Sequence, residues 1–412
     1  MLLRQSLPLL LAAFISGGLA HAGDVSIAER PQLPHFATIQ AGVDAALEGE
    51  SLLVVPGTYA SFTIDAKSVQ VFVRGTGVAT ITGKVIVKNL GAAQYSVLSR
   101  LKVTGTLLSS GPQIALEILN STGHVRVQDS SFQGARAGDP YSFTGEGARV
   151  QSSLNVVFSA CTIEGGNALW QPGEPFVDGG PGLRSSSSSI ATYDCTIRGG
   201  DGSVDGAPRG GNGGRGYDGL SYGILAAGCT FVGGNGGAGD YIGYNPGGVG
   251  GDALVIDAGQ AHLLDNTYFG GAGGWPNFPP PGGTIVPLNG SVVDQLPGTK
   301  RRISLTSVNM DDDVVPITIA GQPGDTVYLM LGRRPSFVFK KLLNGTWMIP
   351  TPFLSSSQPV GTIGPGGTLV VNRTFDIPDS TVAARLCWLQ AMCVDTSGQP
   401  TLTGPAHVLS LE

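Results

Sequence analysis

Apolar and polar residues alternate between residues 68 and 120, as they do in β-strands that bury one face. The runs 69–73 (VQVFV) and 84–88 (KVIVK) are the clearest strands of this stretch. Ahead of them, a short helical pattern begins after Thr38, a residue type that caps helix N-termini. Its face consists of Ile39, Val43, Ala46 and Leu47, and Gly49 follows. The pattern predicts a small helix that covers the open end of a strand assembly.

A three-residue signature then returns at nearly constant spacing. It reads Cys-Thr-Ile at 161–163 and 195–197, Cys-Thr-Phe at 229–231 and Asn-Thr-Tyr at 266–268. The steps are 34, 34 and 37 residues (195−161, 229−195 and 266−229). Such a period indicates stacked units, in which the three cysteines form a column with neighbours about 4.8 Å apart. Three thiols in a column cannot all pair, and Cys387 and Cys393 share one predicted strand. We therefore expect no disulfide framework.

The segment 36–59, FATIQAGVDAALEGESLLVVPGTY, resembles the entry region of the pectin-lyase-like family of right-handed parallel β-helices. It looks closest to the segment that opens pectinesterases and many uncharacterised β-helix proteins. The resemblance implies an all-β chain, built as a right-handed parallel β-helix with an N-terminal capping helix. It does not specify a reaction, because the Asn-Thr-Asp, Gly-His-Gly, Gly-Trp-Gln-Asp and Trp-Ile-Asp-His motifs of enzymes with this fold are absent from the helical part of the sequence.

Local composition divides the chain into four segments. Residues 1–22 have the features of a secretory signal peptide, because Arg4 precedes an apolar run at 7–15 and Ala20-His21-Ala22 fits the cleavage pattern. The β-helix is predicted over 23–275, a Pro/Gly-rich linker over 276–299, and an immunoglobulin-like β-sandwich over 300–412. We expect a secreted or cell-surface protein, cleaved near Ala22, whose mature chain has no membrane span.

The composition supports this class and excludes others. Glycine is frequent, with 64 residues, and only 13% of residues are charged, as expected for many short strands joined by turns. The net charge is −6 and no basic block occurs, so nucleic acid is excluded as a partner.

Charged residues recur 23 residues after each of the column cysteines Cys161, Cys195 and Cys229. With one earlier counterpart, the predicted column reads Arg149, Arg184, Asp218 and Asp252. Two glycine-rich segments, 213–221 and 247–255, match the pattern G-G-x-G-x-D-x-L-x, which resembles the nonapeptide of calcium-binding parallel β-rolls. Three interpretations stay open: tight turns in which glycine supplies a positive φ, an ion pair of Asp218 and Asp252 with Arg184, or calcium bound by the two carboxylates.

Long insertions begin at the same corner of each repeat and carry aromatic residues. The members are Tyr141, Trp170, Tyr241, Tyr244 and Trp275, with Phe278 beside them. Flat rings on an exposed flank stack on sugars or dock on proteins, so this flank is a candidate glycan-contact surface. The alternative is that the rings fold inward and hold their own loops in place.

Acidic and basic residues of two neighbouring repeats form the best candidate catalytic cluster. They are Asp178, Arg184, Asp194, Asp201, Asp205 and Arg209, next to Asp218. The first functional hypothesis is a non-catalytic exported protein that binds glycans or partners through its loops. The second is a polysaccharide lyase or glycoside hydrolase that acts on an acidic polysaccharide. The third is a structural spacer that presents the C-terminal domain.

Overall fold

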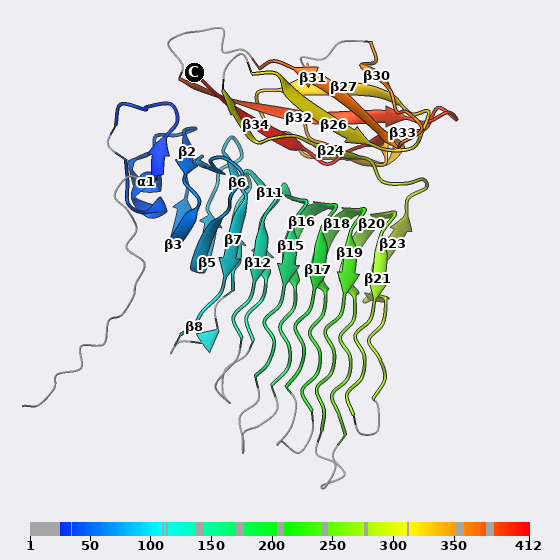
Figure 1. The fold of residues 1–412 in the computed structure, drawn as a ribbon. Coiled ribbons are helices and arrows are strands. Elements are labelled where there is room, and N and C mark those ends of the chain that lie inside the picture. Colours follow the sequence, from blue (N-terminus) through cyan, green and yellow to red (C-terminus); the bar gives the residue numbers. More distant parts are fainter. Residues whose placement is uncertain are drawn as a thin grey trace, which may run out of the picture.

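The computed structural model describes residues 25–33, 35–108, 111–112, 114–136, 144–169, 177–203, 210–239, 246–275, 279–310, 313–350, 358–375 and 383–412. Within these ranges, no helix is long and apolar enough to cross a membrane. The chain forms a right-handed parallel β-helix followed by a β-sheet domain that lies along one of its sides (Figure 1).

The strands of the β-helix fall into three stacks, called A, B and C. Within each stack, strands of successive coils pair in parallel and in register. Stack A comprises β2 (Ser51–Val54), β4 (Gln70–Val73), β6 (Tyr95–Ser99), β11 (His124–Gln128), β14 (Val156–Ser159), the second halves of β16 (Leu183–Tyr193), β18 (Tyr217–Ala227) and β20 (Leu254–Leu264), and β23 (Val292–Gln295). The short β1 (Val25–Ile27) pairs antiparallel with β2.

Stacks B and C complete each coil. Stack B comprises the first halves of β3 (Gly57–Asp65) and β5 (Ala79–Lys88), then β7 (Leu101–Thr104), β12 (Ser131–Gln133), β15 (Thr162–Glu164), β17 (Thr196–Arg198), β19 (Thr230–Val232) and β21 (Thr267–Phe269). Stack C comprises the second halves of β3 and β5, then β10 (Leu116–Leu119), β13 (Ala148–Gln151), the first halves of β16, β18 and β20, and β22 (Ile285–Leu288). A small pair, β8 (Leu107–Leu108) and β9 (Gly111–Pro112), stands apart.

The repeated signature marks the corner between stacks A and B. One residue per coil adopts a left-handed conformation there, and the signature follows it, as at Asp194 (φ 52°) before Cys195. The isoleucine or phenylalanine of the three cysteine-containing signatures is buried in the core, as Ile197 and Phe231 show, and Tyr268 of the fourth is partly buried against it. Cys195, Cys229 and Cys161 are buried free thiols, and the backbone N–H of Cys195 donates to Cys229 Sγ over 3.4 Å. The predicted cysteine column is therefore present, and it helps hold successive coils together.

The predicted N-terminal helix is α1 (Ile39–Ala45), and the Thr38 side chain accepts the N–H of Ala41 over 3.1 Å as its cap. Ile39, Val43 and Ala46 are buried against the end of the β-helix. Leu47 was wrongly placed on the buried face, since it is 60% exposed. The reason is that Ala46 is already extended, so the helical periodicity stops before Leu47.

The predicted linker at 276–299 is only partly a connection. Residues 285–288 and 292–295 form β22 and β23, which pair with β20 and make a last, incomplete coil. The prolines that suggested a linker are compatible with this last coil because its strands lie at the edge of the β-helix. Pro287 lies on the terminal strand of stack C, where a missing N–H removes no ladder bond.

The second domain has two main sheets. One consists of β24 (Arg302–Ser304), β26 (Val315–Ala320) and β31 (Thr368–Arg373). The other consists of β25 (Val308–Met310), β34 (Ala406–Leu411), β32 (Ala384–Val394), β27 (Thr326–Gly332), β30 (Gly361–Thr362) and β33 (Pro400–Leu402). A hairpin of β28 (Val338–Lys340) and β29 (Gly345–Trp347), with the 3-10 turn η1 (Lys341–Leu343) between them, completes the domain. Ile317 and Ile319 of the first sheet share one core with Leu329 and Leu389 of the second.

The second domain rests on the outer face of stack A (Figure 1). Outward-facing Val157, Ala191 and Leu225 are buried in one cluster with Met348 of the second domain. Strands with both faces buried read as nearly continuous apolar runs instead of alternating ones. The runs 156–158 (VVF) and 224–227 (ILAA) carried this signal in the sequence.

Candidate functional site

Glycine-rich arms extend from the corner between stacks B and C, and they form two layers. Arms that follow stack B strands make layer 1, and arms that lead into stack C strands make layer 2. In the layer 1 arm 199–203, Gly199 and Gly202 donate their N–H groups to the next arm of the same layer, whereas Gly200 and Ser203 donate theirs to layer 2. Asp201, between them, donates its N–H to Asn167 Oδ1 of the preceding arm over 2.9 Å. This three-residue period, outside any β-strand, is that of the polyproline II conformation.

Glycine is required in the arms because their backbones touch. A Cβ on Gly200 would lie 2.0 Å from the carbonyl oxygen of Gly166, and one on Gly214 would lie 2.1 Å from that of Gly180. None of the arm glycines that the structure describes has a φ in the left-handed region. The interpretation of these segments as tight turns with positive φ is therefore wrong. Glycine provides close approach instead, as it does in collagen.

Charged side chains form a ladder along stack C, and it includes the predicted Arg184 and Asp218. Arg184 bridges Glu146 and Asp218, at 2.8 and 3.0 Å. Opposite charges alternate through the whole series, at Lys84–Glu117 (2.7 Å), Glu117–Arg149 (3.7 Å), Arg149–Glu146 (2.7 Å), Arg215–Asp218 (2.6 Å) and Arg215–Asp252 (4.0 Å). The hydrogen bond with Glu146 raises the pKa of Arg149. The ion-pair interpretation of this column therefore describes its observed contacts.

The predicted column was wrong at its last member. Arg149, Arg184 and Asp218 are register neighbours, but the residue after Asp218 in this register is Val255. The last repeat is longer by three residues (37−34), and these lie in the arms between β19 and β20. Asp252 therefore lies three positions earlier, where it accepts the N–H of Gly283 over 2.7 Å.

Calcium would need oxygen ligands that are not already engaged. Asp218 accepts from both Arg184 and Arg215, so its carboxylate oxygens are both in use. Among the described residues, no group of three or more His, Cys, Asp or Glu side chains is arranged to hold a metal ion.

The candidate catalytic cluster is dispersed over the fold. Asp178 accepts the N–H of Asn212 in layer 2 over 2.7 Å, and Asp201 pairs with Arg198 on the stack B side at 2.6 Å. Asp194 lies at the corner under the second domain, 3.3 Å from Lys300 Nζ. Burial raises the pKa of Asp194, and Lys300 lowers it in part. Among the members that the structure describes, only Arg184 and Asp218 form an ion pair with each other.

Sequence reasoning missed four members of the charged ladder, namely Lys84, Glu117, Glu146 and Arg215. A three-residue period in the glycine-rich segments was the available signal. Glu146, Arg215 and Asp252 each stand three residues before a stack C register position.

The outer face of stack B carries a row of hydroxyl groups that sequence reasoning did not single out as a surface. Seven of eight register positions hold threonine or serine: Thr58, Thr80, Lys102, Ser131, Thr162, Thr196, Thr230 and Thr267. No side-chain hydrogen bond joins these hydroxyls to the described part of the chain. At about 4.8 Å per coil, the row is roughly 34 Å long.

Aromatic side chains lie beside the end of this row. Phe269 ends β21 and is 55% exposed, and Trp275, six residues later in the arm, is 48% exposed. The three-residue period puts Phe269, Ala272 and Trp275 on one side of that arm. The other predicted ligand-contact residues, Tyr141, Trp170, Tyr241 and Tyr244, lie outside the described residues with Phe278, as do the catalytic candidates Asp205 and Arg209.

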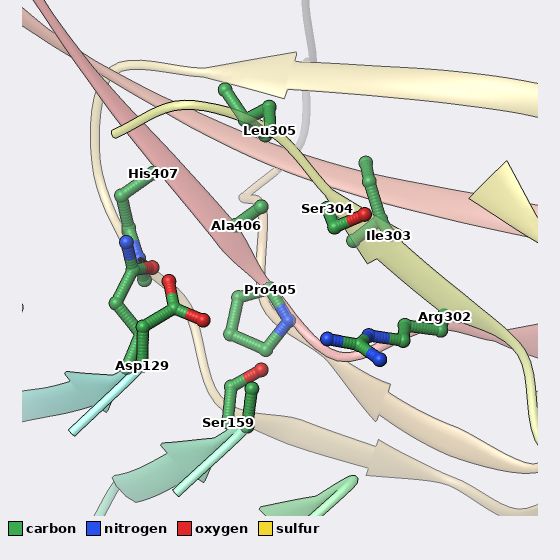
Figure 2. Close-up of a pocket in the computed structure, with 11 residues that line it drawn as sticks. Asp129, Ser159, Arg302, Ile303, Ser304, Leu305, Pro405, Ala406 and His407 are labelled. Atoms are coloured by element: carbon green, nitrogen blue, oxygen red, sulfur yellow. Dashed lines mark hydrogen bonds between the residues drawn. The ribbon is translucent and has the colours of Figure 1, made fainter. Parts of the chain in front are cut away.

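A small cavity lies where the second domain meets the β-helix (Figure 2). Its volume is about 40 Å³, and Asp129, Ser159, Arg302 and His407 are among its lining residues. Partial desolvation raises the pKa of Asp129, while Arg302 and Arg100 lower it. Water molecules fit a space of this size, but ligand pockets usually measure about 300–1,000 Å³. This cavity is therefore too small for a sugar substrate.

No protein-family model matches this sequence, and no curated protein matches it. Among solved structures, the chain is similar to full-length tailspike protein 2 of Escherichia coli O157:H7 bacteriophage CAB120, with 9% identity and a TM-score of 0.27 over 90% of this chain. It spans 66% of that tailspike's length. It is also similar to the A-module of the Azotobacter vinelandii mannuronan C-5 epimerase AlgE4, with 14% identity and a TM-score of 0.19 over 67% of this chain and 92% of the module. At these values, neither likeness bears on function.

Proposed function

We propose that this protein is an exported, non-catalytic binding protein that holds glycan chains on the outer face of stack B and layer 1. The observation that supports the proposal is the straight row of hydroxyls next to exposed Phe269 and Trp275. Hydroxyls at a regular spacing hydrogen-bond to a repeating polar chain, and aromatic rings stack on the apolar faces of sugars.

Binding is favoured over catalysis because the four charged candidates within the described residues already have partners in the protein. Arg184, Asp194 and Asp201 are ion-paired, and Asp178 accepts a backbone N–H. A glycosidase or lyase needs a carboxylate or a base that faces the substrate with its proton-transfer capacity unused.

Glycan-array binding with the full-length protein tests this proposal. The variants are Phe269→Ala with Trp275→Ala, and Thr196→Val with Thr230→Val, because valine keeps the shape and β-propensity of threonine without the hydroxyl. The matched control is Leu342→Ala, since Leu342 is 84% exposed on η1 of the second domain. We expect each paired variant to weaken glycan binding at least tenfold, and the control to leave it unchanged.

Two results would contradict the proposal. Binding that survives both paired variants would exclude this face as the contact surface. Release of an unsaturated product from a uronate polymer would instead establish the alternative, a polysaccharide lyase.

A further inference from the structure

Arg126 of β11 is fully buried at the seam between stack A and the second domain. Its guanidinium donates to the carbonyl of Asn155 on the β-helix over 2.6 Å and to that of Ser336 on the second domain over 2.8 Å. It also faces the rings of Phe337 and Trp388, at 5.8 and 6.0 Å from their centroids. Among the described residues, no carboxylate forms an ion pair with it. The seam therefore contains a positive charge without a counter-charge.

His407 of β34 lies next to this charge. Its ring packs edge-on against Trp388, with 4.4 Å between centroids. Its Nδ1 bonds to Gln128 Oε1, and an amide oxygen only accepts, so the proton of the neutral ring is on Nδ1. Nε2, where a second proton would bind, is buried without a hydrogen-bond partner among the described residues.

His124 is a second imidazole beside Arg126. It lies two residues earlier on β11, so both side chains point from the same face of the strand. Its Nδ1 is also buried without a partner in the described structure. A proton on His407 Nε2 would put a second buried positive charge beside the guanidinium, with no acceptor for the new N–H in the described structure. A proton on His124 would add a further positive charge next to Arg126.

We propose that this seam is an acid-sensitive latch, in which protonation of His407 and His124 releases the second domain from stack A. Release would uncover the apolar face made by Val157, Ala191 and Leu225. In the released form both imidazoles are exposed to solvent and bind protons more readily. Protonation therefore shifts the equilibrium between the docked and the released second domain toward the released form.

The sign follows from the direction of the shifts. Burial, with Arg126 as the second cause, lowers the pKa of His124 to about 3 and that of His407 well below its usual value. The released rings titrate near 6.5. The docked form is therefore favoured fully above about pH 6.5, and it loses a factor of about ten per pH unit per histidine below that value.

Other charged groups also face this part of the seam. Asp129 and Arg302 line the cavity beside His407, and Arg334, Glu29 and Glu48 act on Tyr95, the neighbour of His124 on β6. Lys300 and Asp194 pair farther along the same seam. Acid also acts on these ion pairs, because a protonated carboxylate no longer attracts its cationic partner. The test must therefore separate protonation of the histidines from protonation of the carboxylates.

The test is a pH titration of the full-length protein from 7.5 to 4. Small-angle scattering reports release through the radius of gyration, and far-UV circular dichroism reports whether the strands remain. We expect release below pH 6 with intact strands, and a plot of log K against pH whose slope corresponds to between one and two protons. His407→Gln keeps a donor for Gln128 without titrating, His124→Asn removes the second imidazole, and His35→Gln is the control outside the seam.

Each histidine variant should reduce the slope by about one proton, whereas the control should keep it. The proposal is overturned if both single variants keep the wild-type slope, which would assign release to carboxylates or to His262 of β20, whose ring stacks on Phe339 of the second domain with 4.0 Å between centroids. It is also overturned if the wild type stays docked at pH 4 with intact strands. If a variant fails to fold, the slope of log K against pH for the wild-type protein tests the proposal by itself. A slope near zero shows that release takes up no proton, and this excludes the latch.

Discussion

The hydroxyl of Tyr193 accepts the backbone N–H of Thr346 over 3.0 Å, although the two residues are 153 positions apart. Tyr193 belongs to stack A and Thr346 to the hairpin of the second domain, and both are fully buried. Burial raises the pKa of Tyr193 to about 12, so the phenol stays neutral over the physiological range. The two domains are therefore joined by a specific polar contact as well as by apolar packing.

Tyr193→Phe removes that acceptor and leaves a buried N–H unsatisfied. We expect a loss of about 1–3 kcal/mol in the free energy of unfolding, because an orphaned buried donor loses its full hydration. Urea denaturation of the full-length protein measures it. Tyr222→Phe is the matched control, since Tyr222 is 59% exposed, and it should change little. Equal effects of the two variants would exclude a special role for the Tyr193 contact.

Gly200→Ala tests the close contact between neighbouring arms of layer 1. The new Cβ would meet the carbonyl oxygen of Gly166 at 2.0 Å, so the arms must separate, at a cost of about 1–3 kcal/mol or more. Thermal unfolding measures the loss. Gly366→Ala is the control, because nothing lies within 4 Å of the Cβ it would add. An unchanged melting temperature for Gly200→Ala would show that the arms tolerate side chains.

Glu146→Gln tests the charged ladder. Glu146 is only 5% exposed and pairs with both Arg149 and Arg184, so the change leaves two guanidinium groups with weaker partners. We expect a loss of about 1–3 kcal/mol, measured by denaturant titration. Asp65→Asn is the comparison, because the Asp65–Lys88 pair is solvent-exposed, and its effect should be much smaller. The prediction fails if the two variants are equally stable.

Calcium should not stabilise the protein, because Arg184 and Arg215 already occupy the oxygens of Asp218. The measurement is a thermal melt in millimolar calcium, repeated after addition of a chelator. A calcium-dependent rise of the melting temperature that the chelator reverses would restore the metal hypothesis for Asp218 and Asp252.

The five cysteines should be free but mostly unreactive in the native protein. Burial raises the pKa of Cys195 and Cys229 well above the usual value and that of Cys393 to about 12, so little thiolate exists at pH 8. In the native protein, a thiol reagent should react first with Cys387, which is partly exposed. All five cysteines should react only after the protein is unfolded in denaturant without reductant. Fewer than five thiols in denaturant would reveal a disulfide.

Much of the fold was predictable because stacking repeats local rules. The cap at Thr38 and the buried Cys, Ile and Phe of each signature depend on nearest neighbours in the sequence or on the next coil. The charged column was predictable only as far as Asp218. A constant offset assumes a constant repeat length, and three additional residues in the arms displaced Asp252.

The candidate site was less predictable, because contacts between distant segments decide it. Asp194 was grouped with Arg184 by sequence distance, but the coil turns between them and places Asp194 against Lys300. The glycines were assigned to turns because composition alone does not distinguish a positive φ from close packing. That distinction depends on whether another backbone lies within about 2 Å of the missing Cβ, as at Gly200.

The amino-acid sequence by itself determined the coil, since residues with one fixed period must bury the same face in every turn. The tertiary structure decided which outer faces remain available. It covered stack A with the second domain, neutralised the charges of stack C through Arg184 and its neighbours, and left the hydroxyls of stack B, such as Thr196, without side-chain partners in the described structure. These differences arise because burial and ion pairing depend on segments that are far apart in the chain, and no local pattern encodes which of them meet.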